Sequence, residues 1–366
     1  MKIEVNNNTI TFNNNKKKTE IHPLWLRERV SSKEYLDKKT EQRLFDPSFL
    51  ENIKIKYAII KGNVLELTFS DGVHSKFQID KLTSEFLDKN NLFNTIKINL
   101  WDSSLKKYPK YNYKKNFFKS KEMYNLLKSF YKYGFVIIKN LPTKNNFIIK
   151  FANSIGNVRA TNFGEFFNVK SLPNPNDLAY TSLPLSPHTD NPYRKPIPCI
   201  QLLHCIENEV SGGRSTLVDG FKVANYLKKI NPNFFKILTK IKVKFKFTDK
   251  NVVLENDGPL IELDDNKNLK QVRFSTRLDF VPILKKNELD LYYKARKKIS
   301  DLYNSDKFKI EFKLIPGDLL MMDNYRLLHG RTAYNPNEGK RYLQGCYIDY
   351  DSSEGKLRHL KRNFDN

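Results

Sequence analysis

The sequence predicts an α+β protein that is mainly β, with a jelly-roll barrel, flanking helices and a small β-rich N-terminal domain. Between residues 179 and 350 the chain is mostly short strand-like segments separated by Gly- or Pro-containing turns, as at residues 211–214 and 316–318. Many short strands joined by such turns are typical of jelly-roll barrels. Residues 198–206 are almost entirely apolar and predict a strand buried on both faces.

The chain of 366 residues is long enough for one large domain and one smaller domain. We expect the small domain over residues 1–95, where strands over 55–60 and 64–69 flank a Lys-Gly-Asn turn. Residues 96–119 are rich in Lys, Tyr and Asn, show no clear hydrophobic period, and are expected to form a surface linker. The large domain then covers residues 120–366.

Three helices are expected in the large domain. Ser120 is a favourable cap for a helix that Gly134 ends, and a strand over residues 135–138 follows. Further helices are expected over about residues 145–155 and 287–303, and the last of these interrupts the run of strands.

The formal net charge is +24, which is compatible with a basic nucleic-acid-binding protein or with an anionic membrane as partner. The excess is mostly Lys scattered among Asn and Ile along the whole length, and no DNA- or RNA-binding motif accompanies it. We therefore expect no nucleic-acid and no membrane partner. The aromatic content of 13% and hydrophobic content of 39% allow a sizeable core and exclude a wholly disordered chain.

The cysteine content indicates a reducing compartment. The three cysteines, Cys199, Cys205 and Cys346, are odd in number and contain no C-x-x-C pair, which disfavours a disulfide framework and a thiolate zinc site. The first residues lack the apolar run of a signal peptide, and no apolar run reaches the ~20 residues of a membrane span. A cytoplasmic protein is expected.

One short motif suggests a metal site. His188 and Asp190 stand two residues apart, and on an extended strand such residues point to the same side. His329 lies far downstream, where we expect an apolar strand to give way to a turn at Gly330. Two imidazoles and one carboxylate on one face of a metal are the ligand set of non-haem Fe(II) oxygenases.

The other histidines carry weaker signals. His204 lies within an apolar strand and is expected to be a core histidine with its hydrogen bonds satisfied. His22, His74 and His359 have no partner at metal-ligand spacing.

Arg341 follows the second histidine at a distance that suits a dicarboxylate co-substrate. 2-Oxoglutarate chelates Fe(II) through its keto acid end, and its other carboxylate then requires a fixed bidentate donor such as a guanidinium. A hydroxyl from Ser215 or Thr216 could add a further hydrogen bond.

Taken together, these motifs resemble the gamma-butyrobetaine and trimethyllysine dioxygenase family, within the taurine-dioxygenase-like group of Fe(II)/2-oxoglutarate oxygenases. They run in family order across about residues 120–355. The motifs that carry the resemblance are residues 179–181, 188–190, 201–206, 212–221, 316–318, 323–331 and 341–347, with 25–27 and 71–81 in the small domain.

The resemblance implies a double-stranded β-helix in which His188, Asp190 and His329 hold Fe(II) and Arg341 holds 2-oxoglutarate. With O2, such an enzyme decarboxylates 2-oxoglutarate to succinate and hydroxylates an unactivated C–H bond. The iron and the co-substrate supply the hard chemistry, and the protein supplies ligands, orientation and a dry pocket.

In the family the substrate's trimethylammonium head lies in an aromatic cage, as cation–π attraction requires. The matching positions in this chain are Phe163, Phe167, Tyr180 and Tyr347, all aromatic. Asp177 stands where butyrobetaine hydroxylases tend to carry an amide near the substrate carboxylate, and trimethyllysine relatives carry an acid there.

Two departures from the family pattern bear on function. Family members often bind zinc in the N-terminal domain through three cysteines and a histidine, of which only His74 is present, so we expect no zinc. Phe167 replaces the Trp that is typical of butyrobetaine hydroxylases.

The expected activity is hydroxylation of a trimethylammonium carboxylic acid, with gamma-butyrobetaine, which gives carnitine, as the first candidate. Trimethyllysine or another betaine is the main alternative, and a general taurine-dioxygenase-like oxygenase of small acids is the second. A non-catalytic nucleic-acid-binding protein is the alternative from another class. The resemblance also implies a homodimer formed through the N-terminal domain.

Overall fold

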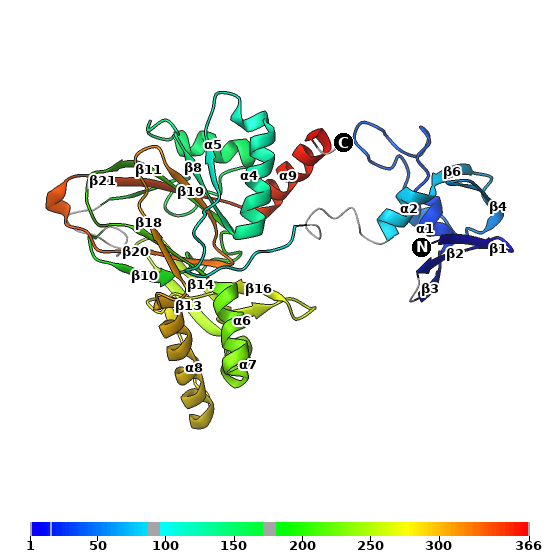
Figure 1. Ribbon diagram of the computed structural model, residues 1–366. Coiled ribbons are helices and arrows are strands. Elements are labelled where there is room, and N and C mark those ends of the chain that lie inside the picture. The colour runs from blue at the N-terminus through cyan, green and yellow to red at the C-terminus, as the bar shows by residue number, and fades with distance from the viewer. Residues whose placement is uncertain (1, 15–16, 87–95, 171–180, 365–366) are drawn as a thin grey trace. The chain divides into compact units, whose positions relative to one another are not determined.

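The computed structural model consists of two compact units, Met1–Thr95 and Ile96–Asn366 (Figure 1). The residues that the structure describes are 2–14, 17–86, 96–170 and 181–364. Each unit has its own buried core, so each is described by itself.

Over its described residues, the first unit contains two three-stranded antiparallel sheets, two α-helices and one short 3-10 helix. Alternating burial along β5 places Leu65, Leu67 and Phe69 in a core shared with Ile10 and Phe12. Its elements are β1 (Lys2–Asn6), β2 (Thr9–Asn14), β3 (Lys17–Glu20), α1 (Pro23–Arg27), η1 (Pro47–Phe49), β4 (Ile55–Lys61), β5 (Val64–Phe69), β6 (His74–Gln78) and α2 (Ile79–Phe86).

The second unit is built on a double-stranded β-helix made of two facing sheets, as the sequence predicts. The six-stranded sheet has the order β7 (Lys110–Asn112), β8 (Phe135–Lys139), β19 (Leu319–Asp323), β11 (Ile200–Asn208), β21 (Arg341–Ile348) and β9 (Phe167–Val169). The four-stranded sheet has the order β10 (Leu185–His188), β20 (Leu327–Arg331), β12 (Ser215–Asp219) and β18 (Lys309–Phe312).

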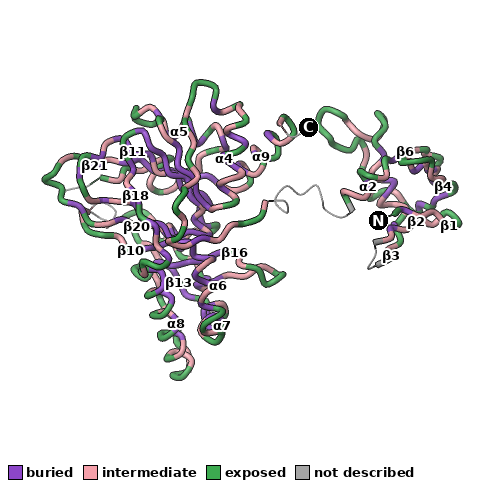
Figure 2. Tube along the Cα trace, viewed as in Figure 1, coloured by how far each residue is buried: buried purple, intermediate pink, exposed green. Residues whose placement is uncertain are grey.

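Apolar side chains from both sheets form one core cluster between them. Phe135 and Leu320 come from the six-stranded sheet, and Leu217, Leu327 and Ile310 from the four-stranded one. Figure 2 shows buried residues running along these strands. Burial of such apolar surface is the main stabilising contribution to the barrel.

The segment over residues 96–119, expected to be a linker, lies within the second unit. Trp101 is only 3% exposed and packs edge-on against Phe135 at 5.4 Å between ring centroids. Further along, β7 pairs in parallel with β8, and η2 (Phe117–Lys119) leads into the next helix. Trp101, with Leu105 and Tyr108 packed beside it, thus attaches this segment to the core of the barrel.

The helices beside the six-stranded sheet follow their sequence signals. α4 (Lys121–Tyr133) begins after Ser120, whose hydroxyl accepts a hydrogen bond from the Met123 amide, and ends at Gly134 with φ of 78°. α5 (Phe147–Ile155) packs against β11 and β21, and α9 (Tyr350–Phe364) packs on α4.

A helical lobe was not predicted. The run of short strands expected after residue 206 is interrupted by α6 (Gly220–Ile230) and α7 (Pro232–Lys240) as well as by the expected α8 (Lys286–Asn304). Asp219 caps α6 by accepting hydrogen bonds from two backbone amides, and Asn231 caps α7 before Pro232. Asp and Asn also begin turns, so the local sequence alone did not distinguish a helix start from a turn between strands.

The remaining described elements of the second unit are short strands and one 3-10 helix. They are β13 (Val243–Thr248), β14 (Val253–Gly258), β15 (Ile261–Leu263), β16 (Leu269–Val272), β17 (Asp279–Phe280) and η4 (Pro336–Glu338). Within the described ranges, none of the helices combines the length and apolar character needed to cross a bilayer.

Candidate active site

The structure brings together the three residues that the sequence predicts as metal ligands. His188 at the end of β10 and His329 on β20 are paired across the two strands, with ring centroids 4.4 Å apart. Both Nε2 atoms face Asp190 Oδ1, at 3.5 Å from His188 and 3.6 Å from His329. One ligand atom from each residue lies within 4.8 Å of the others, and the described residues contain no other such group of three.

Backbone contacts fix the Asp190 loop that follows β10. The Asp190 amide donates to Asn324 Oδ1 at 2.7 Å, and Asn324 Nδ2 donates back to the Asp190 carbonyl at 2.9 Å. His188 Nδ1 lies 2.9 Å from the Ser186 carbonyl, which can only accept, so Nδ1 donates this hydrogen bond and Nε2 is directed toward Asp190. The loop thus presents one nitrogen and one oxygen toward His329.

The position of His329 differs from the prediction. The expected turn at Gly330 is wrong, because β20 continues through Gly330 to Arg331. A Cβ on Gly330 would lie 2.3 Å from the Leu185 carbonyl oxygen, which no side chain tolerates. Glycine is therefore required for the close approach of β10 and β20, and not for a turn.

The electrostatics of the triad suit a divalent metal. Burial is the largest influence on His329 and lowers its pKa to about 4 against the opposing pull of Asp190, so the imidazole is neutral at pH 7. Burial alone would raise the pKa of Asp190, but His329, His188 and the Tyr347 hydroxyl together hold it below its usual range. Two imidazole nitrogens and one carboxylate fit Fe(II).

A cavity on one side of the triad leads to the predicted co-substrate residues. It is lined by all three triad residues and by Ser215 and Arg341. Thr216 does not line it, because alternate residues of β12 point to opposite faces and its hydroxyl lies beside Gly330.

Arg341 has the unmet hydrogen-bonding capacity that a carboxylate ligand requires. It is 8% exposed and donates from Nη2 to the Gly213 carbonyl at 3.1 Å. Its Nε and Nη1 atoms are buried and have no hydrogen-bond partner among the described residues. Leaving charged donors unpaired in a buried position is costly, and an anion in the cavity would supply the missing acceptors.

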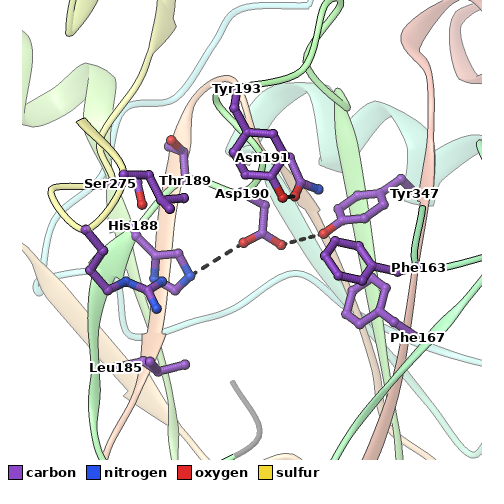
Figure 3. A pocket seen from close by; sticks show the side chains of 12 residues that line it. Phe163, Phe167, Leu185, His188, Thr189, Asp190, Asn191, Tyr193, Ser275 and Tyr347 are labelled. Atoms are coloured by element: carbon purple, nitrogen blue, oxygen red, sulfur yellow. Dashed lines mark hydrogen bonds and ion pairs between the residues drawn. The ribbon is translucent and has the colours of Figure 1, made fainter. Parts of the chain in front are cut away.

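A second cavity is lined by His188 and Asp190 of the triad and by the described aromatic residues predicted for substrate. Figure 3 shows Asp190 between His188 and Tyr347, with Phe163 and Phe167 beside Tyr347. The Phe167 and Tyr347 rings lie 5.3 Å apart with a 31° interplanar angle. Phe163 packs edge-on against Phe247 at 5.7 Å. Tyr180 and Asp177, also predicted for substrate, lie outside the described residues.

Sequence reasoning missed several residues of this second cavity. Tyr193 lines it and stacks on Phe247 at 4.9 Å, and Asn191, Ser275 and Arg277 line it as well. Tyr193 and Asn191 follow the metal motif directly, a proximity that could have drawn attention to them. Ser275 and Arg277 lie in a loop with no local signal.

Gln201 was also missed, although it contacts a triad residue. Its Nε2 donates to Asp190 Oδ2 at 2.5 Å, and Tyr347 donates to the same oxygen at 2.7 Å. An amide inside the otherwise apolar strand was the available signal, since buried polar side chains have partners.

His204 is buried as expected, but its hydrogen bonds are not satisfied. The residue is fully buried on β11, and neither ring nitrogen has a partner among the described residues. Burial lowers its pKa to about 4, so the folded protein holds it neutral.

Comparisons with known proteins agree with this geometry. The model of the taurine catabolism dioxygenase TauD, TfdA family matches residues 110–347. The chain is 32% identical to human gamma-butyrobetaine dioxygenase over 94% of its own length and 92% of that protein. It is 28% identical to mouse mitochondrial trimethyllysine dioxygenase, over 92% and 82% of the two chains.

Among solved structures, an asparagine oxygenase in complex with Fe(II), hydroxyasparagine and succinate has a TM-score of 0.50 at 15% identity, covering 63% of this chain and 79% of that one. At this identity the likeness shows the fold. The family match and the long alignments agree with the His-Asp-His geometry. This protein is a dioxygenase and belongs to the taurine catabolism dioxygenase TauD, TfdA family.

Proposed function

We propose that the protein hydroxylates a trimethylammonium carboxylic acid with Fe(II) and 2-oxoglutarate, and that gamma-butyrobetaine, giving carnitine, is its first candidate substrate. The observation that carries this proposal is a single cavity whose wall joins His188 and Asp190 of the triad to a group of aromatic rings. The 32% identity to gamma-butyrobetaine dioxygenase supports the same substrate class.

In this proposal His188, Asp190 and His329 hold Fe(II), and Arg341 with Ser215 binds the far carboxylate of 2-oxoglutarate. When bound, the iron and 2-oxoglutarate supply the chemistry that reduces O2, releases succinate and CO2, and hydroxylates a C–H bond. The protein's own part is positioning. The Arg341 donors fix the co-substrate at one end, and the buried His188 with the half-buried Asp190 and His329 holds the iron beside it.

The aromatic rings suit the cationic end of the substrate. Phe163, Phe167 and Tyr347 offer ring faces and edges within one cavity, and cation–π attraction is strongest where water is excluded. Tyr193 adds a further ring that is only 4% exposed. The predicted Tyr180 stays part of the proposed cage.

Arg277 suits the anionic end. It lines the same cavity as the aromatic rings, and its charge is among the influences that lower the pKa of His329, which indicates proximity to the metal ligands. A substrate with a cation on the rings and a carboxylate near Arg277 would place a carbon between them beside the triad. The position of Asp177 is the predicted feature that instead favours trimethyllysine, whose amine could pair with an acid.

A coupled succinate assay over gamma-butyrobetaine, trimethyllysine, glycine betaine and taurine tests the proposal. We expect turnover with the quaternary ammonium acids and the highest kcat/KM with gamma-butyrobetaine. Highest turnover with trimethyllysine would select that alternative, and turnover with taurine alone would select the sulfonate alternative. No turnover with any quaternary ammonium compound would contradict the cage.

The cation–π contribution can be isolated by comparing gamma-butyrobetaine with its carbon isostere, in which tert-butyl replaces trimethylammonium. Phe163→Leu should raise the KM for the betaine about fivefold, equivalent to about 1 kcal/mol, and leave the KM for the isostere nearly unchanged. Phe163 is the appropriate site because it lines the substrate cavity and not the co-substrate cavity. Equal losses for both compounds would indicate shape recognition only.

Three further expectations remain predictions. The arrangement of triad and Arg341 disfavours a nucleic-acid-binding protein without chemistry, which would be retained on DNA in a salt-dependent way and take up no iron. We expect no stoichiometric zinc in the purified protein by elemental analysis. Sedimentation at micromolar concentration would test the homodimer.

A further inference from the structure

The two oxygens of Asp190 have different surroundings. Oδ1 faces the Nε2 atoms of His188 and His329 at 3.5 and 3.6 Å. Oδ2 points the other way and accepts hydrogen bonds from Gln201 Nε2 at 2.5 Å and from the Tyr347 hydroxyl at 2.7 Å. Figure 3 shows the Tyr347 bond and the His188 contact on opposite sides of the carboxylate.

The two donors form a cross-strand pair. Gln201 on β11 and Tyr347 on β21 are direct Cα partners, so their side chains leave the six-stranded sheet on the same face. The histidines come from the four-stranded sheet. Asp190 therefore contacts side chains from both sheets of the barrel, through hydrogen bonds at Oδ2 and through the two histidines at Oδ1.

Gln201 and Tyr347 can each act only as a hydrogen-bond donor toward Asp190. A carboxylate only accepts hydrogen bonds, so the Gln201 amide must present its nitrogen and Tyr347 must keep its proton. Gln201 and Tyr347 are 2% and 4% exposed, respectively, so neither has water as an easy substitute. Gln201 Oε1 is buried without a hydrogen-bond partner among the described residues, a cost that the bond to Asp190 offsets.

We propose that Gln201 and Tyr347 are positioning residues that restrict Asp190 to metal coordination through Oδ1 alone. A carboxylate released from these donors can rotate and bind a metal with both oxygens. That arrangement would fill a coordination position needed by the co-substrate. The inference rests on the metal site of the proposed function and does not depend on which betaine is the substrate.

The chain provides a matched control for the tyrosine. Tyr193 lines the same cavity, but its hydroxyl donates to Asn191 Oδ1 at 2.5 Å and not to Asp190. Tyr347→Phe and Tyr193→Phe each remove one hydroxyl and keep the ring. Only Tyr347→Phe should change the coordination of a metal bound at the triad.

The test uses Mn(II), a redox-stable octahedral probe, in the full chain under anaerobic conditions. Water-proton relaxation counts exchangeable waters on the bound ion, and a titration of 2-oxoglutarate gives its Kd. We expect about three waters in the wild type and Tyr193→Phe, and about two in the double variant Gln201→Met/Tyr347→Phe. The 2-oxoglutarate Kd should rise about tenfold in the double variant.

The possible results distinguish a failure of the metal site from a failure of the positioning role. A wild type that binds no Mn(II) would overturn the metal site itself. Equal water counts and equal 2-oxoglutarate affinity in wild type and double variant would overturn the positioning role and leave the metal site standing. If the double variant does not fold, Tyr347→Phe alone decides by the same two readouts, because it keeps the ring contact with Phe167.

Discussion

His188 and His329 are paired neighbours on adjacent antiparallel strands, with their rings 4.4 Å apart. Two imidazoles from distant parts of the sequence therefore meet because β10 and β20 share a register. The register depends in turn on Gly330, where the Leu185 carbonyl of β10 occupies the space of a side chain. The position of His188 relative to His329 thus depends on the close backbone approach of these strands.

Gly330→Ala should separate the two histidines without changing either one. The new Cβ would approach the Leu185 carbonyl oxygen to 2.3 Å and Thr216 Oγ1 to 2.9 Å, so β10 must move. We expect a loss of about 1–3 kcal/mol in stability and at least tenfold weaker Mn(II) binding. Thermal unfolding and anaerobic metal titration measure the two effects.

Gly355→Ala is the matched control for this substitution. Gly355 lies on α9, and a Cβ there meets nothing within 4 Å. Its replacement should leave metal affinity unchanged and raise stability slightly, because alanine favours a helix. Wild-type metal affinity in Gly330→Ala would show that the strand approach does not control the site.

Arg341→Lys should weaken 2-oxoglutarate binding while keeping the charge. The guanidinium offers two buried unpaired nitrogens in a fixed geometry, and an ammonium cannot reproduce this bidentate contact. We expect the KM for 2-oxoglutarate to rise about tenfold to a hundredfold, equivalent to about 1.4–2.8 kcal/mol, with little change in Mn(II) affinity. Steady-state kinetics with varied 2-oxoglutarate measures it.

Arg214→Lys provides the comparison for Arg341→Lys. Arg214 forms a surface ion pair with Glu311, and exposed pairs contribute little. An equal rise in KM in both variants would point to a general loss of structure.

Arg277→Gln should raise the KM for a carboxylate-bearing substrate. The residue is exposed at the cavity wall, so screening limits the effect to about fivefold, and the effect should shrink at high salt. Lys298→Gln removes a charge from an exposed position on α8 outside the cavities described above and should change nothing. Kinetics with gamma-butyrobetaine at two ionic strengths checks this, and parallel behaviour of the two variants would contradict a specific contact.

His204→Leu should make the second unit less sensitive to acid. Burial lowers the folded-state pKa of His204 to about 4, against 6.5 as its ordinary value. The unfolded chain therefore binds more protons than the folded one between these values, so stability is complete above about pH 6.5 and falls as the pH drops toward 4. Between pH 7 and pH 5 the variant should lose about 2 kcal/mol less than the wild type.

Urea unfolding at the two pH values measures this difference. Trp101 fluorescence in a Trp25→Phe background reports on the second unit, because these are the two tryptophans of the chain. An identical pH dependence in the presence and absence of His204 would show that the folded protein protonates it freely.

The sequence determined by itself those features that depend on residue type and near neighbours. Ser120 and Gly134 bound α4 as expected, since capping is local, and the residue types of His188, Asp190 and His329 were enough to predict them as candidate metal ligands that the fold brings together. The helices α6 and α7 were missed because Asp219 and Asn231 begin turns as readily as helices.

Only the tertiary structure decided which distant residues face one another. Strand register places Gln201 opposite Tyr347 and both on Asp190 Oδ2, and no local pattern encodes a pairing that hydrogen bonds between remote strands establish. The same holds for Gly330, whose missing side chain is explained by β10 and not by a turn. Residue chemistry thus predicted which side chains form the site, and the packing of the two sheets determined how they are arranged.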